Sequence, residues 1–136
     1  MAQEEKTREE AKRMYKPIKS YWITDKADKE LPTYAEELGK KLVKNGLTNS
    51  KIRSIYGEIK RIQTGDYKKC ESSFFLLRPK MAYAAGREGK NIGVQLFKFF
   101  FDDAYTYVND EKTFKNFCNL IEAVLAYHKA YGGKEN

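Results

Sequence analysis

The stretch Thr48–Thr64 reads Thr-Asn-Ser-Lys-Ile-Arg-Ser-Ile-Tyr-Gly-Glu-Ile-Lys-Arg-Ile-Gln-Thr and is followed by Gly65. Its apolar residues recur at helical spacing, at Ile52, Ile55, Tyr56, Ile59 and Ile62. That spacing turns one face of a helix toward a hydrophobic core. Each residue rotates a helix by about 100°, so Arg53 and Lys60 fall on the opposite face, with Arg61 at its margin. The stretch therefore predicts an amphipathic helix with a basic outer face.

Working outward, other segments show the same periodicity. We expect further helices at 34–44, 66–77, 80–87, 92–108 and 111–131. The first begins at the capping-box pattern Thr33–Glu36 and ends at Asn45-Gly46. Pro79 disfavours helical geometry at Arg78 and predicts a kink or a fresh start there, and Gly86 offers a C-cap. Three prolines and nine glycines in 136 residues also favour helices over a many-turned β fold. The predicted fold class is all-α, a compact bundle of five or six helices.

The N-terminal region differs from the rest in its densely alternating charges. We expect residues 1–32 to form a charged extension, helical or frayed, that ends in a loop at Leu31-Pro32. Residues 33–136 are predicted to form a single helical-bundle domain. In the helix expected at 92–108, Phe99 lies off the apolar stripe. This position favours a contact with the N-terminal segment over one with another subunit.

Positive charge is concentrated in the middle of the chain. The net charge is +7, and residues 40–90 hold 13 Lys and Arg against 4 Asp and Glu. The remainder is slightly acidic, with 13 against 15. Such a distribution is typical of a surface that binds a polyanion, although an ordinary lysine-rich surface has the same composition.

The stretch Leu77–Arg87 sets cations around small residues, which lets a bulky partner come close. Together with the basic face of 48–64 it predicts one patch across a helical hairpin, formed by Arg53, Lys60, Arg61, Arg78, Lys80 and Arg87. Such a patch contacts phosphates without reading bases, and its affinity falls with salt. Tyr56 and Tyr83 are able to stack on bases, but we expect them in the core or at its boundary.

The sequence shows no active site. Its one histidine, His128, lies on an apolar helical face and is expected to be structural. Asp102 and Asp103 are neighbours on a helix and diverge, so they predict a solvated edge and not a Mg²⁺ site. Cys70 and Cys118 lack metal-ligand spacing and are expected to be reduced thiols in the core. We predict no catalytic residue, no metal and no cofactor.

The chain shows neither a secretory signal nor a run of about eighteen apolar residues, which predicts a cytoplasmic protein with no membrane partner.

Two other classes of protein compete with a phosphate-binding module. Segments 34–44 and 49–64, joined by a turn, match a helix-turn-helix DNA-binding regulator. Against it, Ile52, Ile55 and Tyr56 lie early in the would-be recognition helix, and base-reading side chains are sparse on its free face. A purely structural adaptor accounts for the many aromatic residues but leaves the concentrated charge unexplained.

Three blocks resemble the signature blocks of the small subunit of the type III-A CRISPR Csm complex. They are Asn-Gly-Leu-Thr-Asn-Ser-Lys-Ile-Arg at 45–53, Leu-Arg-Pro-Lys-Met-Ala-Tyr-Ala-Ala-Gly-Arg at 77–87 and Ala-Tyr-His-Lys-Ala-Tyr-Gly-Gly at 126–133. The order and spacing also match, and the resemblance covers about residues 33–133.

The resemblance implies a small helical protein of antiviral defence that is not an enzyme. It implies stacking in several copies inside a ribonucleoprotein, beside other Csm subunits, with contacts to guide RNA and target RNA. By position in the blocks it implies RNA contacts at Arg53, Lys80 and Arg87. Lys60, Arg61 and Arg78 are expected to bind RNA from helical geometry alone.

Overall fold

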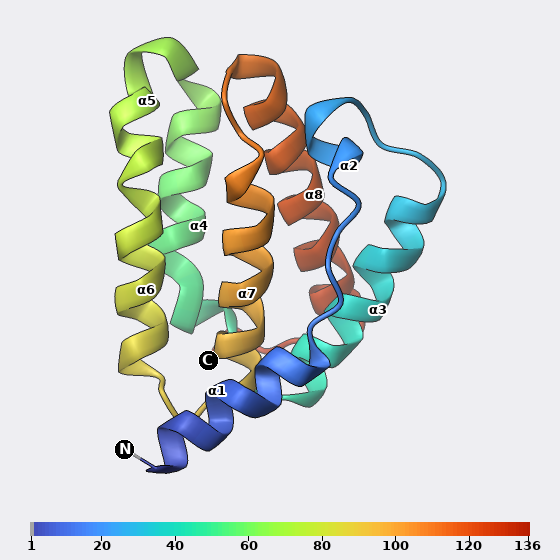
Figure 1. Cartoon of the computed structure of the whole chain (residues 1–136), viewed down its shortest axis with the longest axis vertical. Coiled ribbons are helices and arrows are strands. Elements are labelled where there is room, and N and C mark those ends of the chain that lie inside the picture. Colours follow the sequence, from blue (N-terminus) through green and yellow to red (C-terminus); the bar gives the residue numbers. More distant parts are fainter. Residues whose placement is uncertain (1) are drawn as a thin grey trace.

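The computed structural model describes residues 2–136, and these form eight helical segments (Figure 1). In chain order they are α1 (Ala2–Met14), α2 (Tyr21–Thr24), α3 (Glu30–Lys44), α4 (Asn49–Thr64), α5 (Tyr67–Phe75), α6 (Leu77–Arg87), α7 (Ile92–Thr106) and α8 (Glu111–Ala130). Residues 2–136 contain no strand, which confirms the all-α prediction. The helices outnumber the five or six predicted because the N-terminal region adds α1 and the single turn α2.

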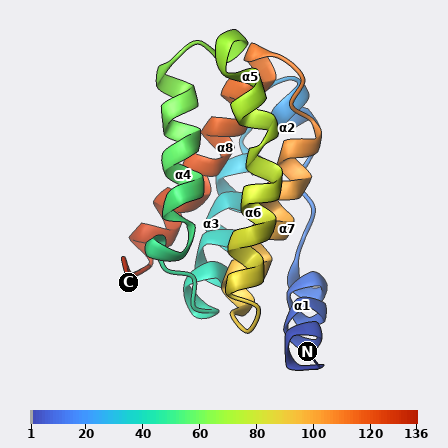
Figure 2. The same ribbon diagram turned by 90° about the vertical axis from the view of Figure 1, so that its left-hand side faces the viewer.

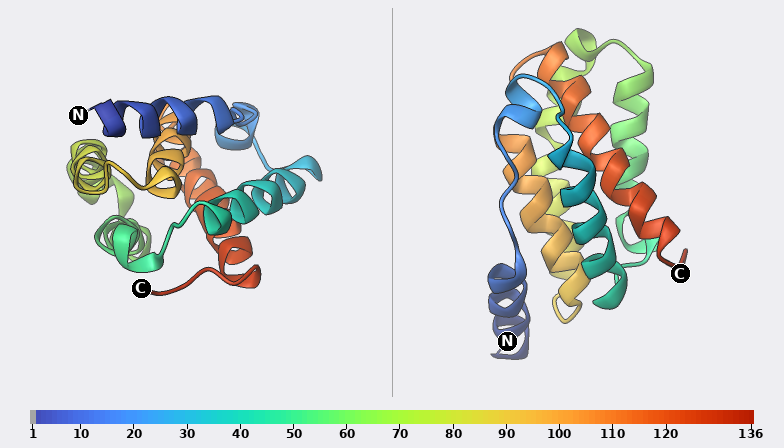
Figure 3. Two further views of the ribbon diagram at one scale, coloured as in Figure 1. Left: turned by 90° about the horizontal axis from the view of Figure 1, so that it is seen from below. Right: turned by 90° about the vertical axis from the view of Figure 1, so that its right-hand side faces the viewer.

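The bundle has a central pair of helices with others on either side. In Figure 1, α7 and α8 lie in the middle, α4, α5 and α6 on one side, and α3 on the other. Figure 2 shows α4 and α6 side by side on one face of the bundle. In Figure 3, α1 lies across one end of the bundle, and it packs on α7.

Aromatic side chains fill the middle of the bundle. The largest fully buried rings are Phe74, Phe97, Phe100, Phe101 and Phe117. The stripe predicted for 48–64 is confirmed at its four isoleucines, which are at most 1% exposed, while Tyr56 is half-buried. One face of α4 therefore faces the core, and the opposite face is free.

Two prolines lie inside helices where the sequence predicts boundaries. Helix α3 begins at Glu30 and not at residue 34, so Pro32 is its third residue. Pro79 is likewise the third residue of α6, and the break falls earlier, at Leu76. Neither proline removes a helical hydrogen bond, because N–H groups in the first turn have no partner within the helix. The helix starts predicted at 34 and 80 are therefore wrong.

The two predicted glycine C-caps have different outcomes. Gly46 follows α3 with φ of 90°, which confirms the cap at Asn45-Gly46. Gly86, in contrast, lies inside α6, and the cap residue is Glu88. The predicted cap at Gly86 is wrong, since the helix continues to Arg87.

The N-terminal region packs on the bundle. The boundary predicted at residue 32 falls inside α3. The Asp103 carboxylate accepts hydrogen bonds from the Tyr15 hydroxyl (2.6 Å) and from the backbone N–H of Ile18 (3.1 Å). The Phe99 ring lies 6.5 Å from that of Tyr15, so the predicted contact of Phe99 with this region is confirmed. The region also places apolar side chains in the common core: Ala11, Ile18, Trp22 and Ile23.

Among residues 2–136, no helix combines the length and the apolar character that a membrane span needs.

Candidate nucleic-acid interface

A groove of about 900 Å³ lies between α4 and α6. Helix α6 contributes positions 80, 83, 84 and 87, which form one helical stripe, and α4 contributes its first two turns. The residues that line the groove are Ser50, Lys51, Arg53, Ser54, Lys80, Tyr83, Ala84, Arg87 and Glu88.

Three of the six predicted phosphate-binding residues meet in this groove. Arg53 comes from α4, and Lys80 and Arg87 come from α6. These are the three positions that the family resemblance implies. Lys51 is a fourth cation of the groove, and its Nζ lies 2.8 Å from Glu88 Oε1. Because Glu88 is the only carboxylate among the lining residues, the groove is strongly basic.

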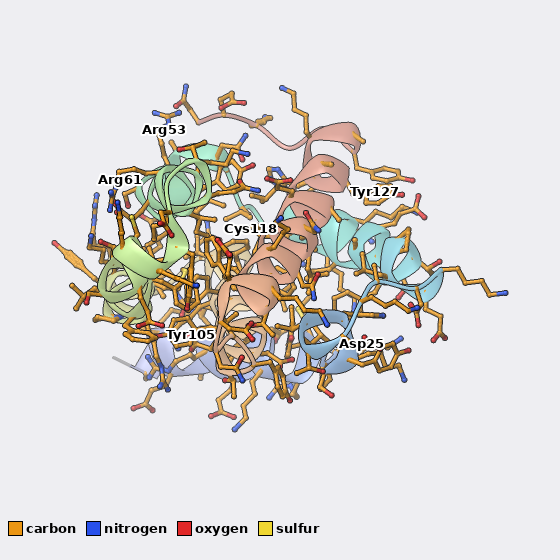
Figure 4. The ribbon with its side chains drawn as sticks, turned by 90° about the horizontal axis from the view of Figure 1, so that it is seen from above. Asp25, Arg53, Arg61, Tyr105, Cys118 and Tyr127 are labelled. Carbon is orange, nitrogen blue, oxygen red and sulfur yellow. The ribbon has the colours of Figure 1, made fainter. Side chains whose placement is uncertain are left out.

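The other three predicted residues lie outside the groove. Lys60 donates to Glu122 of α8 at 2.9 Å, and Arg61 donates to Glu58. These hydrogen bonds raise the pKa of Lys60 and of Arg61. Figure 4 shows Arg53 and Arg61 at the outer edge of the molecule, whereas Cys118 is buried in the bundle. Helix α4 has its cations on its outer face, but Arg53 lines the groove whereas Lys60 and Arg61 pair with carboxylates outside it.

Arg78 also faces away from the groove. It precedes Lys80 by two residues, which corresponds to about 200° around the helix. Its charge is close enough to Tyr105 of α7 to oppose the rise that burial causes in the Tyr105 pKa. Arg78 thus belongs to the α6–α7 side of the molecule.

An exposed tyrosine lies among the groove cations. Tyr83 is 62% exposed, and the Arg87 guanidinium lies 5.9 Å from the centre of its ring. The expectation that Tyr83 lies in the core or at its boundary is wrong, because Met81 and Ala85 supply the buried side of α6. An exposed ring beside cations is a platform on which a nucleobase can stack.

Buried contacts hold the groove from behind. Gln95 of α7 is 3% exposed, and its Nε2 donates to the backbone oxygens of Ala85 (2.8 Å) and Glu88 (3.0 Å). These bonds add a side-chain donor to two carbonyl groups at the end of α6, which also accept from the backbone N–H groups of Glu88 and Asn91. The end of α6 that carries Arg87 is therefore fixed to the core.

His128 has a structural position. Its ring is fully buried, and Nε2 lies 2.8 Å from the backbone oxygen of Leu47, just before α4. The backbone of Gly133 lies so close to the ring that an added Cβ would be 2.1 Å from it. The third signature block thus fixes the last helix to the loop that leads into α4.

The acidic and thiol side chains show no catalytic arrangement. Asp102 pairs with Lys98 at 2.7 Å, whereas Asp103 accepts hydrogen bonds from the N-terminal region, so the two carboxylates diverge as predicted. The solvated edge predicted for this pair is wrong at Asp103, because Tyr15 and Ile18 partly bury its carboxylate. Burial raises the pKa of the Cys118 thiol to about 12. Both cysteines are free, and Cys118 is buried in the core as predicted, whereas the core position predicted for Cys70 is wrong because this residue is only partly buried. Within residues 2–136 no three His, Cys, Asp or Glu side chains are grouped so that they could hold a metal ion.

Sequence reasoning missed Lys51, Ser50 and Ser54 on the α4 wall. Ser50 lies three residues before Arg53 and four before Ser54, which places it on their face of α4, and Lys51 lies three residues before Ser54 at the edge of that face. That signal was available in the sequence. What the sequence did not reveal is that this face lies against α6.

Comparison with known proteins assigns a family. The family model described as Csm2 Type III-A matches residues 25–134. The chain is 31% identical over 98 residues to the CRISPR system Cms protein Csm2 of Enterococcus italicus, covering 64% of this chain and 69% of that protein. It is 39% identical over 61 residues to the protein of the same name from Streptococcus thermophilus, covering 43% of this chain and 48% of that protein. No solved structure matches.

Because the family match spans most of the sequence, the chain belongs to the Csm2 Type III-A family. This confirms the resemblance drawn from the three sequence blocks. The chain is accordingly a small subunit of a type III-A CRISPR effector.

Proposed function

We propose that this subunit is a non-catalytic RNA-binding component that holds the backbone of guide or target RNA in the α4–α6 groove. The observation that carries the proposal is the convergence of Arg53, Lys80 and Arg87 on one groove from two helices. Phosphate contacts to these cations position an RNA strand and carry no sequence information. Tyr83 offers a stacking surface beside them.

The charge of the groove sets the expected salt dependence. Each phosphate neutralised on a single strand contributes about −0.7 to the slope of log affinity against log salt. Three phosphate contacts therefore give a slope of about −2. A single copy with so few contacts binds weakly, and an array of copies gains affinity by multivalency. We accordingly propose that copies stack along the RNA beside the other Csm subunits.

The helix-turn-helix alternative is less well supported. The exposed first turns of α4, which such a protein would place in the major groove, line a groove against α6 instead. A protein of that class would also prefer a specific duplex over random RNA by about 10³-fold.

The test compares two triple variants that remove the same charge. One replaces Arg53, Lys80 and Arg87 with Gln, and the other replaces the cations outside the groove, Lys60, Arg61 and Arg78. Binding of a labelled single-stranded RNA is followed by fluorescence anisotropy across a salt titration. We expect the groove variant to lose at least about tenfold in affinity and about 2 from the salt slope, and the control to change little. Equal losses in the two variants would remove the groove from the proposal.

Two further measurements address assembly and catalysis. The wild-type chain should co-purify with tagged Csm subunits and guide RNA. Labelled RNA incubated with the purified chain and Mg²⁺ should stay intact. Cleavage that disappears in a His128→Ala variant would contradict a non-catalytic role.

A further inference from the structure

A second groove lies on the other side of α4, between α4 and α8. Its volume is about 590 Å³, and its lining includes Asn49, Arg53, Gly57, Leu125, Lys129 and Glu135. Arg53 lines this groove and the α4–α6 groove alike. The start of α4 is thus a ridge between two hollows.

The Glu135 side chain occupies the rim of this second groove and gathers three donors. Its carboxylate accepts a hydrogen bond from Asn49 Nδ2 at 3.0 Å. It also lies 3.9 Å from Lys129 Nζ and 4.0 Å from Arg53 Nη2. Two helices therefore supply an amide and two cations to a single anion.

The backbone around Glu135 completes the start of α4. The N–H groups of Asn49 and Ser50 donate to the backbone oxygens of Lys134 (2.9 Å) and Glu135 (2.7 Å). These N–H groups have no partner within the helix. Because the backbone oxygens satisfy them, the Glu135 carboxylate is not needed to hold the chain in place. Its side chain can leave the three donors while the backbone stays.

An amide and two cations around one anion are also the donors that a phosphate group takes. The ion pairs that Glu135 makes here are open to water, since the side chains of Arg53, Lys129 and Glu135 are 66%, 69% and 57% exposed. Exposed ion pairs contribute little and are screened by salt. A polyanion is therefore able to displace the carboxylate.

We propose that Asn49, Arg53 and Lys129 form a second phosphate-binding site, which the Glu135 carboxylate occupies in the free chain and for which it competes with RNA. The proposal rests on RNA binding in the α4–α6 groove and extends it over α4 through the shared Arg53. The strand then crosses α4 near Gly57, where the helix surface is free of side-chain bulk, since an added Cβ would meet no atom within 4 Å.

The test uses Glu135→Gln, which removes the competing charge and keeps the shape of the side chain. Its matched control is Glu111→Gln, which removes the same charge at the far end of α8. Glu111 lies about 27 Å along the helix from Lys129. At that distance the charge is screened at 0.1 M salt. Anisotropy titrations with single-stranded RNA should show a gain of about two- to fivefold for Glu135→Gln and a salt slope steeper by about 0.7. The control should match the wild type.

Lys129→Gln, alone and combined with Glu135→Gln, tests the competition itself. In the wild type Lys129 exchanges one anion for another when RNA binds, so its removal costs little. With Gln at position 135 the same removal loses the full phosphate contact. The two effects should therefore be non-additive: Lys129→Gln should cost more affinity when Glu135→Gln is also present than it costs in the wild type.

The outcomes separate this proposal from the one on which it rests. Equal affinities for the 135 and 111 variants, or additive effects of the 129 and 135 changes, would overturn the second site and leave the α4–α6 groove standing. Wild-type affinity in the groove triple variant would overturn RNA binding in the groove, and with it this extension.

Discussion

Replacement of Gly39 by Ala tests how closely α3 approaches α8. Gly39 is buried, and a Cβ at this position would lie 2.7 Å from Tyr127 Cβ and 2.9 Å from the backbone nitrogen of His128. The neighbour is largely the backbone of α8, which cannot turn aside as a flexible side chain does. Gly57→Ala is the matched control, because its Cβ would meet no atom within 4 Å.

The two variants share one term and differ in another. Each gains roughly 1 kcal/mol because alanine is a better helix former than glycine. Only Gly39→Ala also carries a cost of overpacking, about 1–3 kcal/mol. The unfolding entropy near 60 °C is about 2.1 cal/mol/K per residue, which over 136 residues gives roughly 0.29 kcal/mol/K. A change of 1 kcal/mol therefore shifts the Tm by about 3–4 °C.

Thermal unfolding followed by circular dichroism measures both variants. Gly57→Ala should melt about 3–4 °C above the wild type, and Gly39→Ala about 3–10 °C below Gly57→Ala. The difference between the variants isolates the packing cost, since the helix-forming gain cancels. A Gly39→Ala protein that melts at or above the temperature of Gly57→Ala would refute the close approach of α3 to α8.

Three further predictions concern α8 and the thiols. Hydrogen bonds from Thr113 hold the pKa of Asp110 below its usual value. They therefore stabilise the folded chain fully above the unfolded pKa of about 3.9, and this stabilisation is lost as the pH falls through the lower folded pKa. Asp110→Ala should thus lower the urea midpoint at pH 7, and its curve should converge with the wild type as the pH approaches 2. Burial raises the pKa of Cys118 to about 12, so a thiol reagent at pH 8 should label only Cys70 in the folded chain and both cysteines in urea. Rapid labelling of Cys118 in the folded chain would contradict this. His128→Ala loses a buried ring and its hydrogen bond, so a urea titration should show a loss on the order of 2–4 kcal/mol, and a loss below about 1 kcal/mol would argue against the structural role.

Periodicity identified the long helices well and their starts less well. Helices α4, α7 and α8 agree with the predicted ranges within two residues, because their apolar stripes are long and regular. Helices α3 and α6 start earlier than predicted, since the rule that a proline disfavours helix before it does not hold in a first turn. Pro32 and Pro79 both occupy that turn.

The N-terminal helix illustrates a different limit. It buries only two small residues against α7, Thr7 and Ala11, among many charged ones. Two small residues give no detectable apolar stripe, so its packing comes from the tertiary arrangement alone. The hydrogen bonds from Tyr15 and Ile18 to Asp103 join residues that are 88 and 85 positions apart, so no local sequence pattern predicts them.

Helical geometry placed each candidate cation on a face but not against a neighbour. It could not show that Lys60 meets Glu122 of α8, or that Arg78 turns toward α7. The sequence blocks did better, because Arg53, Lys80 and Arg87 are the three that share a groove. The sequence did not show that Lys51 lies beside Glu88, because 37 residues separate the two in the chain.

The buried Gln95 gives the α4–α6 groove a property that its surface residues do not have by themselves. Because Gln95 fastens the end of α6 to α7, the backbone under Arg87 is in place before any partner arrives. For the RNA binding proposed above, the loss of freedom on association then falls on side chains, because the backbone that spaces the cations is already fixed. A substitution at Gln95 would therefore change the spacing of the groove cations, although the Gln95 side chain is only 3% exposed.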